Sequence, residues 1–388
     1  MIHSVIGISD DIDLAVAIED VIAECQDNWG DWSCRPQVGI LFTSCMDANF
    51  SDILARILRE FPDIQLIGCT TDGEISRQTG FIEDSLALLL LSSDTLQFAT
   101  AVATDLSQNA EASFRAAFTD ACRTLPNKPV CAFTFPDGLT TIGIALDTAI
   151  RLAFGEFFPV FGGTAGDHSL YTRSYQFCND RVYSDAAPIL LIAGEVQLTS
   201  AVRIGPIPTG LHFALGRHKN NVVYEIDGKT AVAFFREHLG DYREQISEFP
   251  LAVYEKNDTD FYLRDPLYLN EDDGSITFIG TFPEHCTVRL TLVSRKDVLD
   301  AAEQANLSVL DNESGTEPEL ILIFPCTWVR HVLGSKTSDK FALIRQPREK
   351  TPFFGFYCYG EIAPVSAGTP ARFHNDGYVI VALRSRNS

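Results

Sequence analysis

Three glycine-containing turns carry the residues whose types and spacing could bind a small molecule. Residues 66–74 read LIGCTTDGE, residues 160–167 read VFGGTAGD, and residues 353–361 read FFGFYCYGE. Each has an apolar pair, a glycine, three or four residues, a second glycine and an acidic residue. Glycine has no Cβ and tolerates positive φ, so backbone N–H groups in these turns could approach a ligand closely. Alternatively, the glycines serve only tight chain reversals.

Arg330 could hold the carboxylate of such a ligand. It follows Cys326 by four residues, about one helical turn, so both side chains would share a helix face. A guanidinium binds a carboxylate in a two-pronged geometry, and Asp72, Glu74 or Glu361 could accept from a ligand ammonium. This set suits the zwitterion of an amino acid. The structural alternative is an ion pair between Arg330 and Glu361.

Aromatic and hydroxyl side chains of the turns could complete a pocket wall. Tyr357 and Tyr359 are two residues apart, so on a strand they share one face and Cys358 lies on the other. Tyrosines of this kind are as often core residues with a satisfied hydroxyl group. The threonines of the first two turns could donate to a ligand or only to nearby backbone.

The elements that must position these turns alternate between strands and helices. Apolar residues at helical spacing predict helices over residues 14–25, 50–58, 114–121, 142–150, 231–239, 326–333 and 340–344. Asp11 or Asp13 could cap the first of these. Short apolar runs predict strands over residues 38–42, 66–67, 86–91, 96–102, 130–135, 160–161, 189–193, 196–202, 222–226, 320–324, 353–354 and 378–383.

A mixed α/β fold follows from this order, with two lobes built from duplicated strand-helix-strand units that end in glycine turns. Proline and glycine at residues 205–210 predict the hinge between the lobes. The polar residues 306–318 predict a surface loop. Asp273 and Gly274 predict a hairpin tip within the acidic stretch 271–274.

Charge and cysteine usage exclude several classes of function. The formal net charge is −22, from 30 Lys and Arg against 52 Asp and Glu, which opposes binding to nucleic acid or to an anionic membrane. The first residues lack the pattern of a secretory signal, and no apolar run is long enough to span a membrane. The ten cysteines include no C-x-x-C pair, so we expect free thiols, a cytoplasmic protein and no metal site.

The turns and several C-terminal motifs resemble the FIST family, whose members pair an N-terminal and a C-terminal FIST domain. The matching stretches are residues 67–74, 161–167, 225–228, 355–362 and 373–375, together with the Cys-x-x-x-Arg motif of Cys326 and Arg330. The resemblance predicts an N-terminal helical extension over residues 1–36, a FIST N-like domain over 37–208 and a FIST C-like domain over 209–388.

The resemblance also implies a function. FIST proteins of prokaryotic type are sensory, small-ligand-binding modules of signal transduction, and amino acids are proposed as their ligands. Nothing outside the matching span reads as a kinase or cyclase, so a separate signalling protein, such as a kinase, would be the partner. The residues that we expect to bind the ligand are Cys69, Thr70, Thr71, Asp72, Glu74, Gly162, Gly163, Thr164, Asp167, Cys326, Arg330, Tyr357, Tyr359, Glu361 and Asn375.

Three other classes of function stay open. A cysteine-dependent enzyme would use Cys69 or Cys326 with His331 or His168 as its base, although no nucleophile motif surrounds either thiol. A haem-based sensor of nitric oxide or another gas is implied by haem binding in related proteins. Its axial ligand would come from His168, His212, His218, His331, His374 or Cys326. A scaffolding protein would need no ligand. We expect no cofactor unless haem binds.

Overall fold

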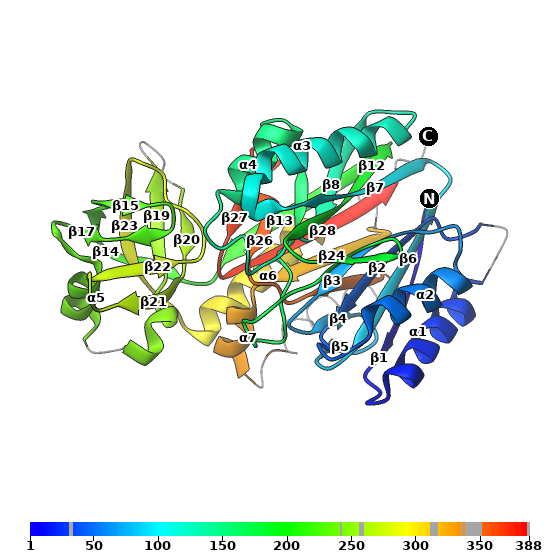
Figure 1. The fold of residues 1–388 in the computed structure, drawn as a ribbon, viewed down its shortest axis with the longest axis horizontal. Coiled ribbons are helices and arrows are strands. Elements are labelled where there is room, and N and C mark those ends of the chain that lie inside the picture. The colour runs from blue at the N-terminus through cyan, green and yellow to red at the C-terminus, as the bar shows by residue number, and fades with distance from the viewer. Residues whose placement is uncertain are drawn as a thin grey trace.

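The structure is a computed structural model that describes residues 1–30, 34–240, 243–255, 260–310, 317–334, 337 and 351–385. Figure 1 shows a large body with helices above and below its sheets, and a smaller β-rich lobe at one end. The body contains three six-stranded sheets. Both chain termini lie at the end of the body away from the smaller lobe (Figure 1).

The first sheet and its two helices form one third of the body. Its strands, in spatial order, are β1 (Ile2–Ser9), β6 (Leu86–Ser93), β2 (Val38–Thr43), β3 (Gln65–Thr70), β10 (Gln176–Cys178) and β11 (Arg181–Tyr183). Helices α1 (Leu14–Trp29) and α2 (Phe50–Glu60) cover its outer face through a shared apolar cluster. Asp13 caps α1 by accepting from the N–H of Ala15, which confirms one of the two predicted caps.

The second sheet has the same arrangement. Its strands, in spatial order, are β27 (Ala371–His374), β26 (Glu361–Pro364), β9 (Val160–Gly163), β8 (Pro129–Thr134), β12 (Ala186–Gly194) and β7 (Leu96–Thr104). Helices α3 (Leu106–Thr124) and α4 (Leu146–Phe154) pack on its outer face, where phenylalanine and alanine side chains interlock. In Figure 1 these helices lie along the upper edge of the body.

The third sheet combines C-terminal strands with a hairpin from the N-terminal half. Its strands, in spatial order, are β13 (Val196–Ile204), β28 (Gly377–Ser385), β24 (Leu320–Pro325), β25 (Phe353–Phe356), β4 (Glu74–Ser76) and β5 (Gly80–Ile82). Helix α6 (Arg295–Leu310) packs on its outer face. Helix α7 (Thr327–Leu333) follows β24 directly and contacts α6.

Each unit donates the two strands that follow its glycine turn to a neighbouring sheet. The parallel pairs β2–β3, β8–β9 and β24–β25 form the centres of the three sheets. The strands after each glycine turn then cross over: β4–β5 joins the third sheet, β10–β11 the first and β26–β27 the second. This cyclic exchange confirms the predicted repeat and places all three units in one body. One continuous apolar core lies between the inner faces of the sheets.

The smaller lobe consists of residues inserted between β13 and α6. One sheet holds β14 (Ile207–Ala214), β23 (Cys286–Leu292), β19 (Leu251–Glu255) and β20 (Tyr262–Arg264). Another holds β15 (His218–Lys219), β16 (Val222–Val223), β22 (Ser275–Phe278) and β21 (Pro266–Asn270), and a third pairs β17 (Glu225–Ile226) with β18 (Lys229–Thr230). Helix α5 (Ala231–Leu239) and the 3-10 helix η1 (Arg243–Glu248) complete the lobe.

The predicted α/β fold is confirmed, although several short strands after the glycine turns and in the smaller lobe were not predicted. Strand β1 and helix α6 were not predicted, and residues 306–310 form the last turns of α6 instead of a loop. The buried Asn306 side chain explains this difference, because it accepts a hydrogen bond from Tyr378 at 3.1 Å. The predicted helix at 340–344 lies outside the described residues. Within the described part of the chain, no helix is both long and apolar enough to cross a bilayer.

The first glycine of each turn allows two strands to pair closely. A Cβ on Gly68 would lie 1.9 Å from the carbonyl oxygen of Leu41, and one on Gly355 would lie 1.8 Å from that of Ile323. A Cβ on Gly162 would likewise lie 1.9 Å from the carbonyl oxygen of Thr134. The obstructing atoms belong to the backbone of a paired strand, so they cannot move without breaking the ladder. Close strand approach therefore requires these three glycines.

Substituting Gly68 or Gly355 by alanine tests this requirement. We expect each variant to lose ~3 kcal/mol of unfolding free energy, because the added methyl group overpacks a fixed backbone contact. Urea denaturation measures the loss. Gly368→Ala is the control: its φ is +80° and nothing lies within 4 Å, so it should lose only the ~1 kcal/mol of a left-handed alanine. Equal losses in all three variants would contradict the steric explanation.

Candidate functional site

The three turns meet and bond to one another through their main chains. Asp72 N–H donates to the carbonyl oxygen of Tyr357 at 3.1 Å, and Gly166 N–H donates to that of Thr70 at 3.0 Å. Thr164 N–H completes the ring by donating to the carbonyl oxygen of Gly360 at 2.8 Å. The turns therefore converge in space, as their repetition in the sequence suggests.

Apolar side chains fill the space enclosed by these turns. Phe42 contacts Phe356 with ring centroids 4.4 Å apart, and Phe135 contacts Phe356 at 5.7 Å. Cys69 and Cys358 belong to the same buried cluster. The turns thus pack against a buried apolar core on this side.

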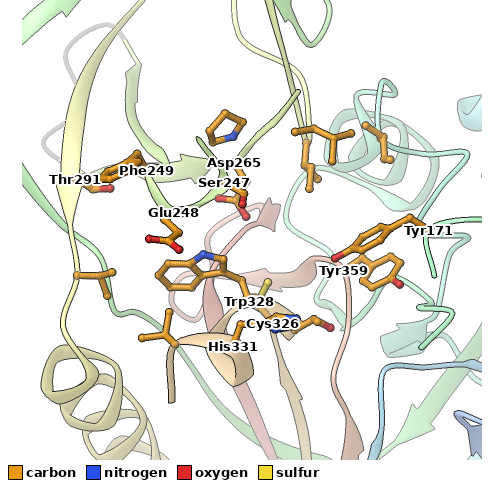
Figure 2. Close-up of a pocket in the computed structure, with 18 of the residues that line it drawn as sticks. Tyr171, Ser247, Glu248, Phe249, Asp265, Thr291, Cys326, Trp328, His331 and Tyr359 are labelled. Atoms are coloured by element: carbon orange, nitrogen blue, oxygen red, sulfur yellow. The ribbon is translucent and has the colours of Figure 1, made fainter. Parts of the chain in front are cut away.

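A cavity of about 640 Å³ lies where the smaller lobe meets the body. Figure 2 shows its labelled side chains arranged around an open centre, with the Trp328 indole in the middle of the lining. The body contributes Tyr171, Cys326, Trp328, His331 and Tyr359, and the smaller lobe contributes Ser247, Glu248, Phe249, Asp265 and Thr291. Of the residues predicted from the sequence, Cys326 and Tyr359 line this cavity.

Asp167 holds the tyrosine wall of the cavity in place. Its carboxylate accepts from the N–H groups of Tyr171, Thr172 and Arg173 at 2.6–2.9 Å, and from the Tyr359 hydroxyl at 2.5 Å. These bonds bring the Tyr171 and Tyr359 rings into a stacked pair, with centroids 4.9 Å apart and planes 14° apart. Asp167 is itself fully buried and acts on the cavity through these two rings.

Arg330 is occupied by bonds within the body. Its guanidinium donates to the carbonyl oxygen of Asp72 at 2.6 Å and pairs with Glu83 at 2.8 Å. The Asp72 carboxylate accepts from the N–H and hydroxyl of Ser169, at 2.6 and 2.5 Å. Both charged groups therefore brace the loops next to the turns, and neither belongs to the cavity lining.

The remaining predicted residues of the turns are engaged with protein neighbours. Thr70 donates to the carbonyl oxygen of Gly166, and Glu74 accepts from the hydroxyls of Ser44, Thr71 and Ser85. Gly162 and Gly163 pair with β26, and Tyr357 packs edge-on against Phe81. With its amide oriented to satisfy both, Asn375 donates to the carbonyl oxygens of Leu263 and Ile279, which ties the body to the smaller lobe.

Buried acidic groups surround the thiol at the floor of the cavity. Burial raises the pKa of Asp265 to about 7, and burial followed by the charge of Asp265 raises that of Asp376 well above its usual range. The pKa of Glu361 is also well raised by burial, although its carboxylate accepts from the N–H of Gly377 at 2.8 Å. The same carboxyl groups, after burial itself, raise the pKa of Cys326.

Family models match both halves of the chain. A FIST N domain matches residues 37–229 and a FIST C domain matches residues 231–364. The chain belongs to the FIST family. FIST domains are associated with sensory signal transduction. The FIST C match spans most of the smaller lobe and continues into the body, so the cavity lies between segments of both domains.

A protein of Methanocaldococcus jannaschii, described as uncharacterized, is 28% identical to this FIST chain over 150 residues. The matched segment is 37% of this chain and 28% of the length of that protein. The FIST chain thus spans little more than a quarter of this curated relative.

The buried thiols of this FIST protein are poor nucleophiles. Burial, and then nearby carboxylates, raise the pKa of both Cys69 and Cys326 well above the ordinary value, so neither forms a thiolate readily at neutral pH. The same surroundings do not fit a haem ligated by Cys326, because one axial bond to iron would leave the carboxyl groups of Asp265 and Asp376 buried beside it. Of the five candidate histidines, His331 lines the cavity, and it is exposed to solvent.

Several cavity residues were missed by sequence reasoning. Asp265 follows the short strand β20, and Asp376, which lies behind the lining beside Cys326, follows the Phe-His-Asn motif directly, so an acidic residue next to a strand was the available signal. Trp328 lies inside the Cys-x-x-x-Arg motif, of which only Cys326 and Arg330 were predicted to bind a ligand. Glu248 and Arg295 carry no local pattern, because their place in the cavity depends on how the lobe docks.

Glu74 provides a test of the hydroxyl cluster in the first turn. Burial raises its pKa from 4.5 to about 7, so the folded state holds a proton that the unfolded chain releases near pH 4.5. This contribution to stability is full below pH 4.5 and is lost as pH rises to about 7. Relative to Glu74→Gln, the wild-type unfolding free energy should fall by up to ~1.4 kcal/mol per pH unit across that window and then level off.

Chemical denaturation between pH 4 and 8 measures the difference. Glu19→Gln, on an exposed face of α1, should show no such trend. A flat difference for Glu74→Gln would mean that folding leaves the pKa of Glu74 unchanged and would contradict this account.

Proposed function

We propose that this protein is a sensory ligand-binding protein that holds an amino acid or a similar zwitterionic metabolite between its body and its smaller lobe. The observation that carries the proposal is the 640 Å³ cavity lined by residues of both parts. Cavities of this size, with aromatic walls and a few polar groups, are the usual form of a small-molecule site. The family association with sensory signalling agrees with it.

The charges on the cavity walls suit a zwitterion. Arg295, at the start of α6, is placed by its Nε, which donates to the carbonyl oxygen of Val332 at 3.0 Å. Its planar guanidinium suits a ligand carboxylate. Glu248, in the smaller lobe, offers a carboxylate for the ligand ammonium, while Trp328 and the stacked tyrosines offer apolar contact and cation–π attraction.

A ligand that bridges the two parts can change how they sit together. Binding shifts a conformational equilibrium only when the ligand prefers one state, and contacts from both parts provide that preference. The arrangement of the lobes would then be read by a separate signalling protein, such as a kinase. We place both in the cytoplasm, since the ten cysteines are free and reduced thiols persist there.

A thermal-shift screen with the twenty amino acids and simple amines tests the proposal. At one hundred times its Kd, a true ligand should stabilise the wild type by ~2.7 kcal/mol, seen as a rise in Tm. Arg295→Gln and Trp328→Ala should each weaken the apparent affinity for the ligand at least tenfold. The rise in Tm at a given ligand concentration should therefore be smaller in both variants. Arg123→Gln, on the exposed face of α3, is the matched control and should keep it. If no compound raises the wild-type Tm, the proposal is wrong.

The haem alternative has its own readout. Because carboxyl groups crowd the cavity floor, we expect no Soret band after expression with added haem or after reconstitution of the purified protein. Absorbance spectra of wild type and His331→Ala provide the measurement. A Soret band that His331→Ala abolishes would establish a haem site and contradict this expectation.

A further inference from the structure

Three potential metal ligands converge at the floor of the cavity. One ligand atom each of Asp265, Cys326 and Asp376 lies within 4.8 Å of the other two. The thiol lies 3.9 Å from Asp376 Oδ1. The three side chains belong to residues that are 5%, 4% and 1% exposed, so solvent does not compensate their charges.

Two oxygens of this cluster have no hydrogen-bond partner. They are Oδ1 of Asp265 and Oδ2 of Asp376, both fully enclosed. Leaving a buried carboxylate oxygen without a donor is costly, and among the described neighbours only a proton on the other carboxyl group could act as one. A bound cation would supply the missing partner for both oxygens at once.

We propose that Asp265, Cys326 and Asp376 bind one zinc ion whose fourth coordination position opens into the cavity. Thiolate and carboxylate are ordinary zinc ligands, at ~2.3 Å for sulfur and ~2.0–2.2 Å for oxygen. Ligand atoms that are within 4.8 Å of one another need only a small inward movement to reach these distances. Asp265 and Cys326 both line the cavity, so a molecule held there reaches the metal.

The ion would join the two parts of the protein. Asp265 lies between β20 and β21 of the smaller lobe, whereas Cys326 and Asp376 lie beside β24 and β28 of the body. Zinc binding displaces the protons of the thiol and carboxyl groups, and its two positive charges offset two of the three negative charges that form. The competing explanation is a proton shared between Asp265 and Asp376, which hydrogen-bond to each other.

The ion also deepens the proposed function, on which this further step rests. The carboxylate of a zwitterionic α-amino acid can coordinate a metal through one oxygen, whereas its ammonium group has no free electron pair and stays available to Glu248. A zwitterionic ligand would then replace water at the open position, and its affinity would depend on the metal.

Titration of the metal-free full chain with Co²⁺ tests the zinc site without any ligand. We expect one Co²⁺ per chain, a thiolate-to-cobalt absorption band in the near ultraviolet, and loss of that band when Zn²⁺ is added. Cys326→Ala should abolish the band. Cys131→Ala, which removes a buried thiol from β8, is the matched control and should keep it.

Two nearly isosteric variants keep the test decisive if Cys326→Ala does not fold. Asp265→Asn and Asp376→Asn should each weaken Zn²⁺ binding at least tenfold, measured by competition with a chromophoric chelator. Absence of the band from the wild type, or its persistence in Cys326→Ala, would overturn the zinc site and favour the shared proton.

The thermal-shift screen repeated with EDTA separates the two proposals. Amino-acid shifts that persist with EDTA, in a protein that binds no Co²⁺, would overturn the zinc site and leave the proposed function intact. A cobalt band without any amino-acid shift would overturn the proposed function and support the metal site alone.

Discussion

The body of this protein depends on three contacts in which a glycine backbone faces the carbonyl oxygen of a neighbouring strand. Gly68, Gly162 and Gly355 occupy equivalent places in the three parallel strand pairs, and a side chain at any of them would collide with backbone less than 2 Å away. Close pairing brings the turns after these glycines together, where they bond to one another. Each unit can then pass two strands to the next sheet, so no sheet is complete without a neighbouring unit.

This exchange explains why the polar residues of the turns hydrogen-bond to other parts of the protein. A turn that bonds to two other turns must satisfy its own polar groups in a space closed to water. Glu74 does so with three hydroxyls, and Asp167 does so with backbone N–H groups and the Tyr359 hydroxyl. The cavity lies farther out, where the third turn meets the smaller lobe. The third turn contributes Tyr359 to the cavity lining, and Asp167 of the second turn holds Tyr359 and Tyr171 in place.

The sequence predicted the periodic elements and the repeat, because each rests on local spacing. The face of α1, the strand pairs and the Asp-Gly hairpin between β21 and β22 all follow from residues close in the chain. Helix α6 was not predicted because alanines and Asn306 form much of its buried face. Asp265 and Asp376 are 111 residues apart and meet only after the smaller lobe docks, so no local pattern could have paired them.

Three buried carboxyl groups make the junction between the body and the smaller lobe sensitive to charge. Asp265 comes from the smaller lobe, while Asp376 and Glu361 come from the body, and docking removes all three from water. Three carboxyl groups so close cannot all ionise, so the docked arrangement holds protons, or a cation in their place. Asn375 and Arg264 bridge the same junction with neutral and cationic donors: Arg264 donates to the carbonyl oxygen of Phe373 at 3.1 Å. A cationic group in the cavity would compensate part of the negative charge that these buried carboxyl groups carry when they ionise.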